Sequence, residues 1–521
     1  MGGKARDAEE EYSLYSVLLE DHVPLASKPL CSASRTFANL FLVIVGVGVL
    51  SVPYTFSKVG WVYGILSLLV GGTLSYYGMM LQLYSKYWIQ KSRGELGLVI
   101  TSYGDLAFHT MGTWGRLSVD ILLTLGTLSG AIAHMAFIGH NVASIASSME
   151  STHVNSIMRL DSSFIVAPCT GLHNVTCSHG AMQNNTVWKP SFERPWRISL
   201  ENHDLPQHGD VNQTFFELVF EHESEDKDGG SSAVYLSLLV HRLACQFLTR
   251  IDWTHSSIYI WCMFPLVLMI CAIPSIMTRV PLSAVANTLN ITALIAIMAS
   301  DVPYIIKTSG FRHMRALGDI VSVPSAIAVG VYSFQASGIM IPLESSMVKP
   351  SKFGVVMATA ITVIGLLYCL LAVLCYAAFG IHTEQIITLN LQSGLDAVLI
   401  KSAISSSVLL GFPLVLTPLF ELAERRFTRR KASIGLRALV LFLVCLLSTT
   451  VKQFAVFLSL SGSSISCLLG FILPAIIHIK AMRESGSKQF SILPLIADYS
   501  LVMFGLVFGL FGTVHSLMKF L

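Results

Sequence analysis

Long, nearly unbroken apolar runs dominate the chain, and short polar segments separate them. Runs such as 37–54, 61–84, 355–379 and 501–518 reach or approach the roughly 20 residues that a helix needs to cross a bilayer. Barrel strands would alternate apolar and polar residues, which these runs do not, and an open sheet would leave unpaired amides in lipid. The pattern therefore predicts an all-α polytopic membrane protein.

About eleven helical spans are predicted. Their limits are 37–57, 60–84, 116–148, 257–277, 282–306, 322–343, 354–379, 395–422, 436–452, 454–479 and 493–518. Residues 1–36 would form a polar, acidic tail, residues 37–521 the transmembrane domain, and residues 149–256 a large polar loop between the third and fourth spans. No short apolar segment with a small-residue cleavage site precedes Phe37, so we expect no cleavable signal peptide.

The composition agrees with this assignment. Hydrophobic residues make up 53% of the chain and charged residues 12%, whereas a soluble domain averages about 25% charged residues. An ordinary soluble enzyme is therefore nearly excluded. The net charge of +3, with no basic run interleaved with aromatics, gives no indication of a nucleic-acid partner. The expected surrounding is the lipid bilayer.

Lys and Arg collect in alternate loops, which predicts a cytoplasmic N-terminus and a luminal or extracellular C-terminus. The loop 149–256 would then lie on the non-cytoplasmic side. It contains three glycosylation sequons, at Asn174, Asn184 and Asn212. Three sequons also arise easily by chance in a polar segment of this length. The same loop contains Cys169, Cys177 and Cys245, which could supply one disulfide and leave one thiol over.

Two apolar spans contain residues that a simple anchor would avoid. The first span includes Gly46, Gly48 and Pro53, and the sixth includes the run 330–338, which begins and ends with glycine. Glycine lowers helix stability by about 1 kcal/mol and proline by about 3 kcal/mol, so both runs predict interrupted helices. Paired interruptions in corresponding positions of two repeats indicate a transporter site near the membrane midplane.

A broken helix frees amide donors where its second half begins and carbonyl acceptors where its first half ends. The carboxylate of an amino acid can bind the amides, and its ammonium group can bind the carbonyls. Small residues such as Gly46, Gly48, Ser333 and Gly338 would leave room for the ligand backbone. The alternative is close packing of helices, since small residues are common at helix contacts in membranes.

Several motifs carry a family resemblance. They are 39–54, followed by Gly60 and Trp61, and 103–106, 119–122, 137–139, 342–344, 376–380, 387–391, 412–414, 418–427 and 457–464. The sequence resembles the amino acid/auxin permease family, and is most similar to its plant and fungal vacuolar neutral amino-acid transporters. The resemblance covers nearly the whole membrane part, but no counterpart of the loop 149–256 is recognised.

The resemblance implies a LeuT-type fold of two inverted five-helix repeats plus one extra helix, and amino-acid transport by alternating access. The residues that would contact substrate are Ile44, Val45, Gly46, Val47, Gly48, Ser333, Phe334, Gln335, Ala336 and Gly338. A sodium-coupled branch of the family has an asparagine where this chain has Leu42. This departure favours proton coupling or facilitated exit.

Ionisable residues inside apolar spans are costly and are candidates for function. His134, Asp120 and Asp301 are candidate proton relays, although a packing role for His134 and an interfacial position for Asp301 are equally simple explanations. Glu344 also lies near a span end, where water would accommodate it. Asp120 would pair with Lys401 if the third and eighth spans are neighbours.

The combined interpretation is a secondary transporter for neutral or aromatic amino acids, coupled to protons or facilitative. We expect it in a vacuolar or lysosome-like membrane, with the plasma membrane as the alternative. The competing hypothesis is an amino-acid sensor of the same fold with little flux. A membrane enzyme is disfavoured because the chain has no His-Glu-x-x-His, Cys-x-x-Cys or phosphate-loop motif. No cofactor and no metal are expected.

Overall fold

The computed structural model describes residues 31–92, 100–164, 256–272, 276–391, 394–427, 433–484 and 492–520. The chain forms two compact units, residues 1–153 with 253–521, and residues 154–252. The first unit holds nearly all the described residues. Regular structure in the described residues is helical, apart from one isolated parallel bridge between Cys31 and Met347.

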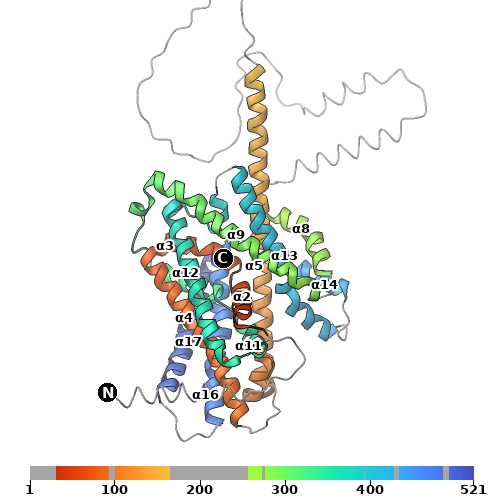
Figure 1. The fold of residues 1–521 in the computed structure, drawn as a ribbon, viewed down its shortest axis with the longest axis vertical. Helices are drawn as coiled ribbons and strands as arrows, with labels where there is room; N and C mark the ends of the chain where they lie inside the picture. Colours follow the sequence, from red (N-terminus) through yellow and green to blue (C-terminus); the bar gives the residue numbers. More distant parts are fainter. Residues whose placement is uncertain are drawn as a thin grey trace, which may run out of the picture. The chain divides into compact units, whose positions relative to one another are not determined.

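The helices follow the predicted spans in order (Figure 1). They are α2 (Ala33–Ile44), η1 (Val47–Ser51), α3 (Val52–Val59), α4 (Trp61–Ser92), α5 (Tyr103–Phe164), α8 (Ser256–Ala272), α9 (Ile276–Thr308), η2 (Gly310–His313), η3 (Ile320–Ser322), α10 (Val323–Ser333), η4 (Ser337–Ile339), α11 (Met340–Ser345), η5 (Pro350–Lys352), α12 (Phe353–Phe379), η6 (Gly380–His382), η7 (Ile387–Asn390), α13 (Leu395–Phe427), α14 (Ile434–Ser448), α15 (Phe454–Ser461), η8 (Gly462–Ser466), η9 (Leu468–Ile472), α16 (Leu473–Glu484) and α17 (Ile492–Phe520).

Eight of these segments are long and apolar enough to cross a membrane, counted over the described residues. Two shorter apolar helices, 256–271 and 434–448, coincide with the predicted fourth and ninth spans. The predicted first span corresponds to the interrupted series α2, η1 and α3. The prediction of an all-helical polytopic membrane protein is confirmed at this level.

The label α5, Tyr103–Phe164, covers two helices that meet at a kink at Gly112, where φ is 72° and ψ is −157°. The predicted third span, 116–148, lies in the second of these helices and begins a few residues after the kink. The first helix, which the sequence pattern did not predict, is capped by the Ser102 hydroxyl, which accepts a hydrogen bond from the Asp105 amide. Arg116, just after the kink, lies 3.6 Å from an Asp105 oxygen of the first helix.

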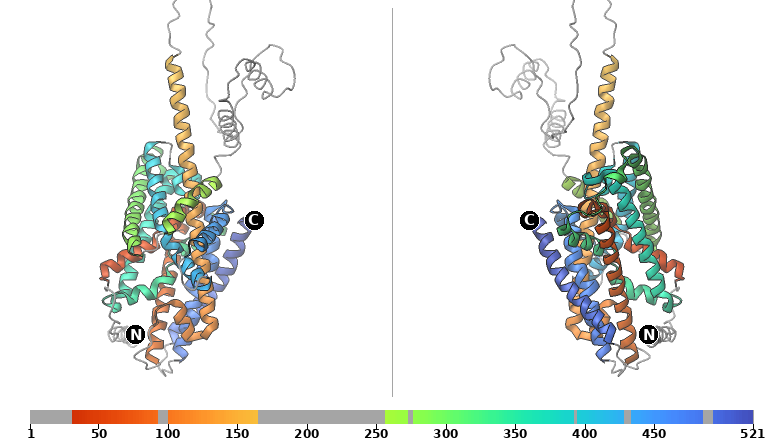
Figure 2. Two further views of the ribbon diagram at one scale, coloured as in Figure 1. Left: turned by 90° about the vertical axis from the view of Figure 1, so that its right-hand side faces the viewer. Right: turned by 90° about the vertical axis from the view of Figure 1, so that its left-hand side faces the viewer.

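Close approach of glycines to neighbouring helices holds the interior together. A Cβ at Gly78 of α4 would meet the Gly470 carbonyl oxygen of η9, and one at Gly462 of η8 would meet the Ala328 carbonyl oxygen of α10, in both cases closer than atoms can approach. Small residues permit this close approach, which is how helices associate in membranes. Helices α4, α10 and α15–α16 therefore pack directly against one another (Figure 2).

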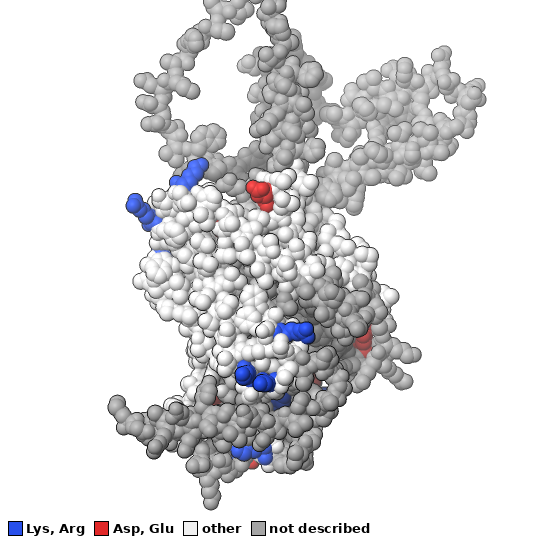
Figure 3. All heavy atoms as spheres, in the orientation of Figure 1, with Lys and Arg blue, Asp and Glu red and all other residues white. Residues whose placement is uncertain are grey.

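The outer face is apolar. Long hydrophobic side chains on α9, α12, α14 and α17 are exposed, among them Ile306, Leu366, Leu443 and Leu510. Figure 3 shows that, on the visible face of the described part, the few Lys, Arg, Asp and Glu side chains are scattered and most of the surface carries no charge. Such a surface matches a bilayer, where charged side chains are costly.

Candidate functional site

The first helix is interrupted where its glycines predicted it. Helix α2 ends at Ile44, Val45 and Gly46 leave helical geometry, and η1 begins at Val47 and continues directly into α3. Val45 has φ −79° and ψ 83°, and Gly46 is extended at φ −114° and ψ −158°. Pro53 lies in the first turn of α3, where its missing amide hydrogen costs no helical hydrogen bond.

The sixth helix is interrupted in the same way. Helix α10 ends at Ser333, Phe334 to Ala336 are non-helical, and the chain resumes as η4 and α11. The amides of Phe334 and Gln335 turn back onto the carbonyls of Gly330 and Tyr332, at 3.1 and 3.3 Å. Both predicted interruptions are therefore present.

The two interruptions lie against each other. A Cβ built on Gly48 would be 2.7 Å from the Ser333 hydroxyl oxygen and 3.3 Å from the Ser333 Cα. The Ser333 hydroxyl donates to the Val329 carbonyl at 2.7 Å, so its position is fixed by its own helix. Gly48 and Ser333 are buried. Gly48 of the first interruption and Ser333 at the end of α10 are thus in direct contact.

The carbonyls at the end of α2 receive donors from two other helices. The Tyr368 hydroxyl of α12 donates to the Ile44 carbonyl at 3.0 Å, and the Asn290 amide of α9 donates to the Val45 carbonyl at 3.1 Å. Both side chains are buried. Neither Asn290 nor Tyr368 is among the site residues predicted from the sequence. In the sequence, each is only a polar residue inside an apolar span, and that position does not indicate which neighbouring helix its side chain contacts.

The amides that follow each interruption lack a side-chain cap. Neither Gly46 before η1 nor Ala336 before η4 makes a capping hydrogen bond through a side chain. Next to the second of these, the Ser337 hydroxyl is 1% exposed and has no partner among the described residues. The first amides of a helix also have no partner within the helix. The site therefore offers donors to a bound anion.

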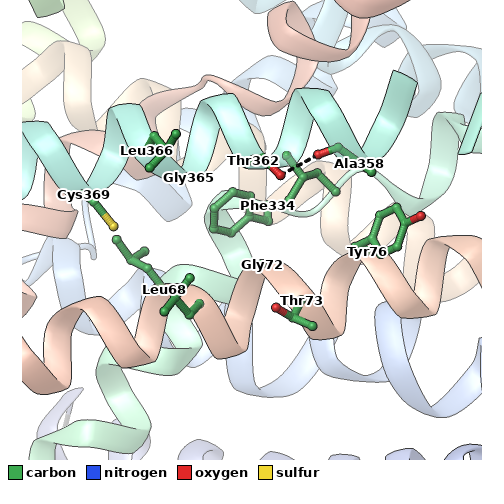
Figure 4. Close-up of a pocket in the computed structure, with 12 residues that line it drawn as sticks. Leu68, Gly72, Thr73, Tyr76, Phe334, Ala358, Thr362, Gly365, Leu366 and Cys369 are labelled. Atoms are coloured by element: carbon green, nitrogen blue, oxygen red, sulfur yellow. Dashed lines mark hydrogen bonds between the residues drawn. The ribbon is translucent and has the colours of Figure 1, made fainter. Parts of the chain in front are cut away.

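Phe334, the first residue of the second interruption, lines an apolar cavity. Its ring packs on Tyr368 with centroids 5.3 Å apart. On its other side it lines a cavity of about 240 Å³ between α4 and α12, together with residues such as Gly72, Thr362 and Gly365. Figure 4 shows the Phe334 ring lying between these two helices. None of the twelve lining side chains is charged.

The three candidate proton relays have separate surroundings. The His134 ring bonds the Gly130 carbonyl of its own helix at 2.7 Å. The Asp120 side chain is 46% exposed and lies 3.8 Å from Arg116. Asp301 is 1% exposed, so the protein itself covers this carboxyl group. The structure does not bring these three side chains into one relay.

Two further sequence expectations about charges are wrong. Lys401 does not pair with Asp120; its ammonium group donates to the Ser144 hydroxyl at 2.9 Å. Glu344 is not at a wet interface, since it is 2% exposed and lies 2.6 Å from the Lys86 nitrogen. The Tyr87 hydroxyl donates to its other oxygen. Helix packing supplies these partners, which hydropathy could not reveal.

Several sequence expectations lie outside the described residues. These are the sequons at Asn174, Asn184 and Asn212, and the cysteines Cys169, Cys177 and Cys245. Over the described ranges, no group of three or more His, Cys, Asp or Glu side chains is arranged to hold a metal ion.

Comparison with known proteins adds the family context. The family profile described as "Transmembrane amino acid transporter protein" matches residues 31–176 and 230–518. Amino acid transporter AVT3C of Arabidopsis thaliana is 30% identical over 497 residues, which cover 95% of this chain and 93% of that protein. Amino acid transporter AVT3A of the same plant is 27% identical, covering 96% and 93%. Vacuolar amino acid transporter 4 of Saccharomyces cerevisiae is 24% identical over 46% of this chain and 40% of its own length.

Proposed function

The chain belongs to the transmembrane amino acid transporter family, and we propose that it is a secondary transporter of neutral or aromatic amino acids that works by alternating access. The observation that carries the proposal is the contact between the two helix interruptions at Gly48 and Ser333. One binding site formed by two broken helices is the arrangement expected where a transporter holds its substrate near the membrane midplane.

The substrate carboxylate would bind the amides that begin η1 and η4. Segment η1 continues into α3, so the helical stretch 47–59 directs its positive dipole end at the interruption. Backbone amides at a helix N-terminus bind anions without a basic side chain. The unpartnered Ser337 hydroxyl can donate one more hydrogen bond to the same group.

The substrate ammonium group would bind carbonyls at the end of α2. The Ile44 and Val45 carbonyls each accept one hydrogen bond, from Tyr368 and Asn290. A carbonyl oxygen has two lone pairs, so each retains one for the ligand. The two neutral donors orient these carbonyls without adding charge.

An uncharged substrate side chain fits the surroundings. Among the side chains that contact the interruptions, Asn290, Tyr368 and Leu123 carry no charge. An unpaired buried charge would be strongly unfavourable there. The neighbouring Phe334 and Tyr368 rings favour apolar and aromatic substrates.

We further propose the LeuT-type arrangement of two five-helix repeats plus one helix, with a cytoplasmic N-terminus and a luminal C-terminus. The interruptions fall in the first and sixth of the spans predicted from the sequence, which is the spacing that such repeats require. Leu42 in place of asparagine favours proton coupling or facilitated exit over sodium coupling. A vacuolar or lysosome-like membrane is proposed by analogy with the vacuolar transporter of yeast.

Reconstitution in vesicles tests the function. We expect saturable uptake of one or more neutral amino acids from a labelled panel, measured with pH and sodium gradients varied independently. No saturable uptake of any amino acid would contradict the proposal. Ligand-dependent thermal stabilisation without flux would instead identify the chain as a sensor of the same fold.

A further inference from the structure

A histidine and an aspartate form a buried pair away from the helix interruptions. The His478 Nδ1 of α16 lies 2.6 Å from an Asp498 carboxylate oxygen of α17. The Tyr77 hydroxyl of α4 donates to the other carboxylate oxygen at 2.9 Å. His478 is 2% exposed and Asp498 is 0% exposed. Three helices thus contribute to one polar cluster. Helix α16 packs against both α4 and α17 (Figures 1 and 2).

The cluster contains one carboxylic acid, one imidazole base and one imidazole nitrogen without a hydrogen-bond partner among the described residues. His478 is the ion-pair partner that the described residues give to Asp498. The second ring nitrogen, His478 Nε2, is buried and has no partner among the described residues. The ionisable side chains facing the pair from α4 are Tyr77 and Tyr84, and the Tyr84 ring lies 6.4 Å from the imidazole. Arg483, farther along α16, is exposed and bonds Tyr499.

The charge of this pair depends on one proton. With a neutral imidazole the buried pair carries a net charge of −1, and with an imidazolium it carries none. A buried uncompensated charge is strongly unfavourable, whereas a paired and hydrogen-bonded one is tolerated. The protonated pair therefore favours close packing of α4, α16 and α17, and loss of the proton favours admission of water between them.

One helical stretch leads from the cluster to the proposed substrate site. Helix α16 continues the π-helical segments η8 and η9, and such segments are frequent at functional sites. Gly470 in η9 faces the interruption of the sixth helix, since its Cβ would lie 3.2 Å from the Gln335 side-chain oxygen. His478 follows Gly470 along the same helical stretch by about 12 Å at 1.5 Å per residue.

We propose that His478 and Asp498 form the proton-binding site through which this transporter couples to a pH gradient. A proton from water on one side binds the pair, and the same proton returns to water on the other side, with no other bond made or broken. The helical stretch from Gly470 in η9 to His478 in α16 transmits the change in packing to the sixth-helix interruption. This inference rests on the proposed transport function and replaces His134, Asp120 and Asp301 as proton relays.

Two neutral variants test the site in reconstituted vesicles. His478→Gln and Asp498→Asn should each abolish accumulation driven by a pH gradient, reducing the accumulation ratio to 1. Exchange of labelled for unlabelled substrate at equal pH on both sides should persist, because the substrate site is unchanged. His140→Gln is the matched control, since His140 is a histidine of α5 whose ring bonds the carbonyl four residues earlier in its own helix, at 2.7 Å. It should retain the full response to pH.

A milder variant covers the case in which the first two fail to fold. Tyr77→Phe removes one hydrogen bond to the Asp498 carboxylate, so the pH at half-maximal uptake should change while the maximal rate is kept. The inference is wrong if His478→Gln and Asp498→Asn accumulate substrate as the wild type does, if His134→Gln alone abolishes coupling, or if wild-type uptake ignores the pH gradient. Only the absence of any wild-type uptake would contradict the proposed function itself.

Discussion

Two alanine substitutions, two residues apart, should separate packing from substrate binding at the first interruption. At Gly48, a Cβ would lie 2.7 Å from the Ser333 hydroxyl and 3.3 Å from both the Ser333 Cα and Cβ. At Gly46, a Cβ would meet nothing within 4 Å, and the extended backbone suits any residue. Gly48→Ala should therefore disturb the packing between the two broken helices, and Gly46→Ala should not.

The magnitude follows from these distances. Adding a methyl group to a closely packed interior costs roughly 1–3 kcal/mol. The upper half of this range applies to Gly48→Ala, because the Ser333 backbone is held within α10 and cannot rotate away as a flexible side chain would. Alanine has a better helix propensity than glycine, which offsets up to about 1 kcal/mol of this loss in the free energy of unfolding. The net loss should be about 1–2 kcal/mol.

The assay combines thermal unfolding in detergent with uptake kinetics. Gly48→Ala should unfold at a lower temperature than the wild type. Adding Ser333→Ala to the same chain should recover only part of the loss, because the new methyl group still crowds the backbone of residue 333. Gly46→Ala should unfold like the wild type but raise KM several-fold, since its methyl group takes up room proposed for the substrate. Equal destabilisation by both substitutions would refute the packing argument, and an unchanged KM for Gly46→Ala would refute the contact with substrate.

Three further predictions concern other parts of the described structure. Glu344→Gln should destabilise the protein by roughly 3–5 kcal/mol in thermal or denaturant unfolding, because it leaves the Lys86 charge buried without its partner, and adding Lys86→Gln should restore part of the loss. Tyr368→Phe should raise KM several-fold with normal folding, since the carbonyl that ends α2 loses its orienting donor, and equal KM values would contradict the ammonium site. Hydrogen bonds from the Ser322 hydroxyl and, to a lesser extent, from the Val321 amide lower the pKa of Asp319. Ionised Asp319 therefore stabilises the fold above its unfolded-state pKa of about 3.9, and this stability is lost as pH falls through the lower folded pKa. The difference in melting temperature between Asp319→Asn and the wild type should accordingly shrink from pH 5 to pH 3.

The sequence by itself determined the elements of this protein. Apolar runs of bilayer length dictated helices, because lipid leaves a backbone amide no other partner. Glycine at 46 and the run 330–338 dictated where two helices break, because loss of helix propensity is a local property. The predicted third span, 116–148, begins a few residues after the kink at Gly112 that divides α5 into two helices.

The tertiary structure alone decided which side chains meet. Asn290 and Tyr368 are ordinary polar residues of apolar spans until helix packing brings them to the carbonyls of Ile44 and Val45. Hydropathy does not predict which face of one helix contacts another. The hydrogen-bond partners of buried polar groups can therefore be identified only in the packed structure. The sequence therefore specified where the two helices break, and only the packed helices specified which side chains donate to the carbonyls at the first break.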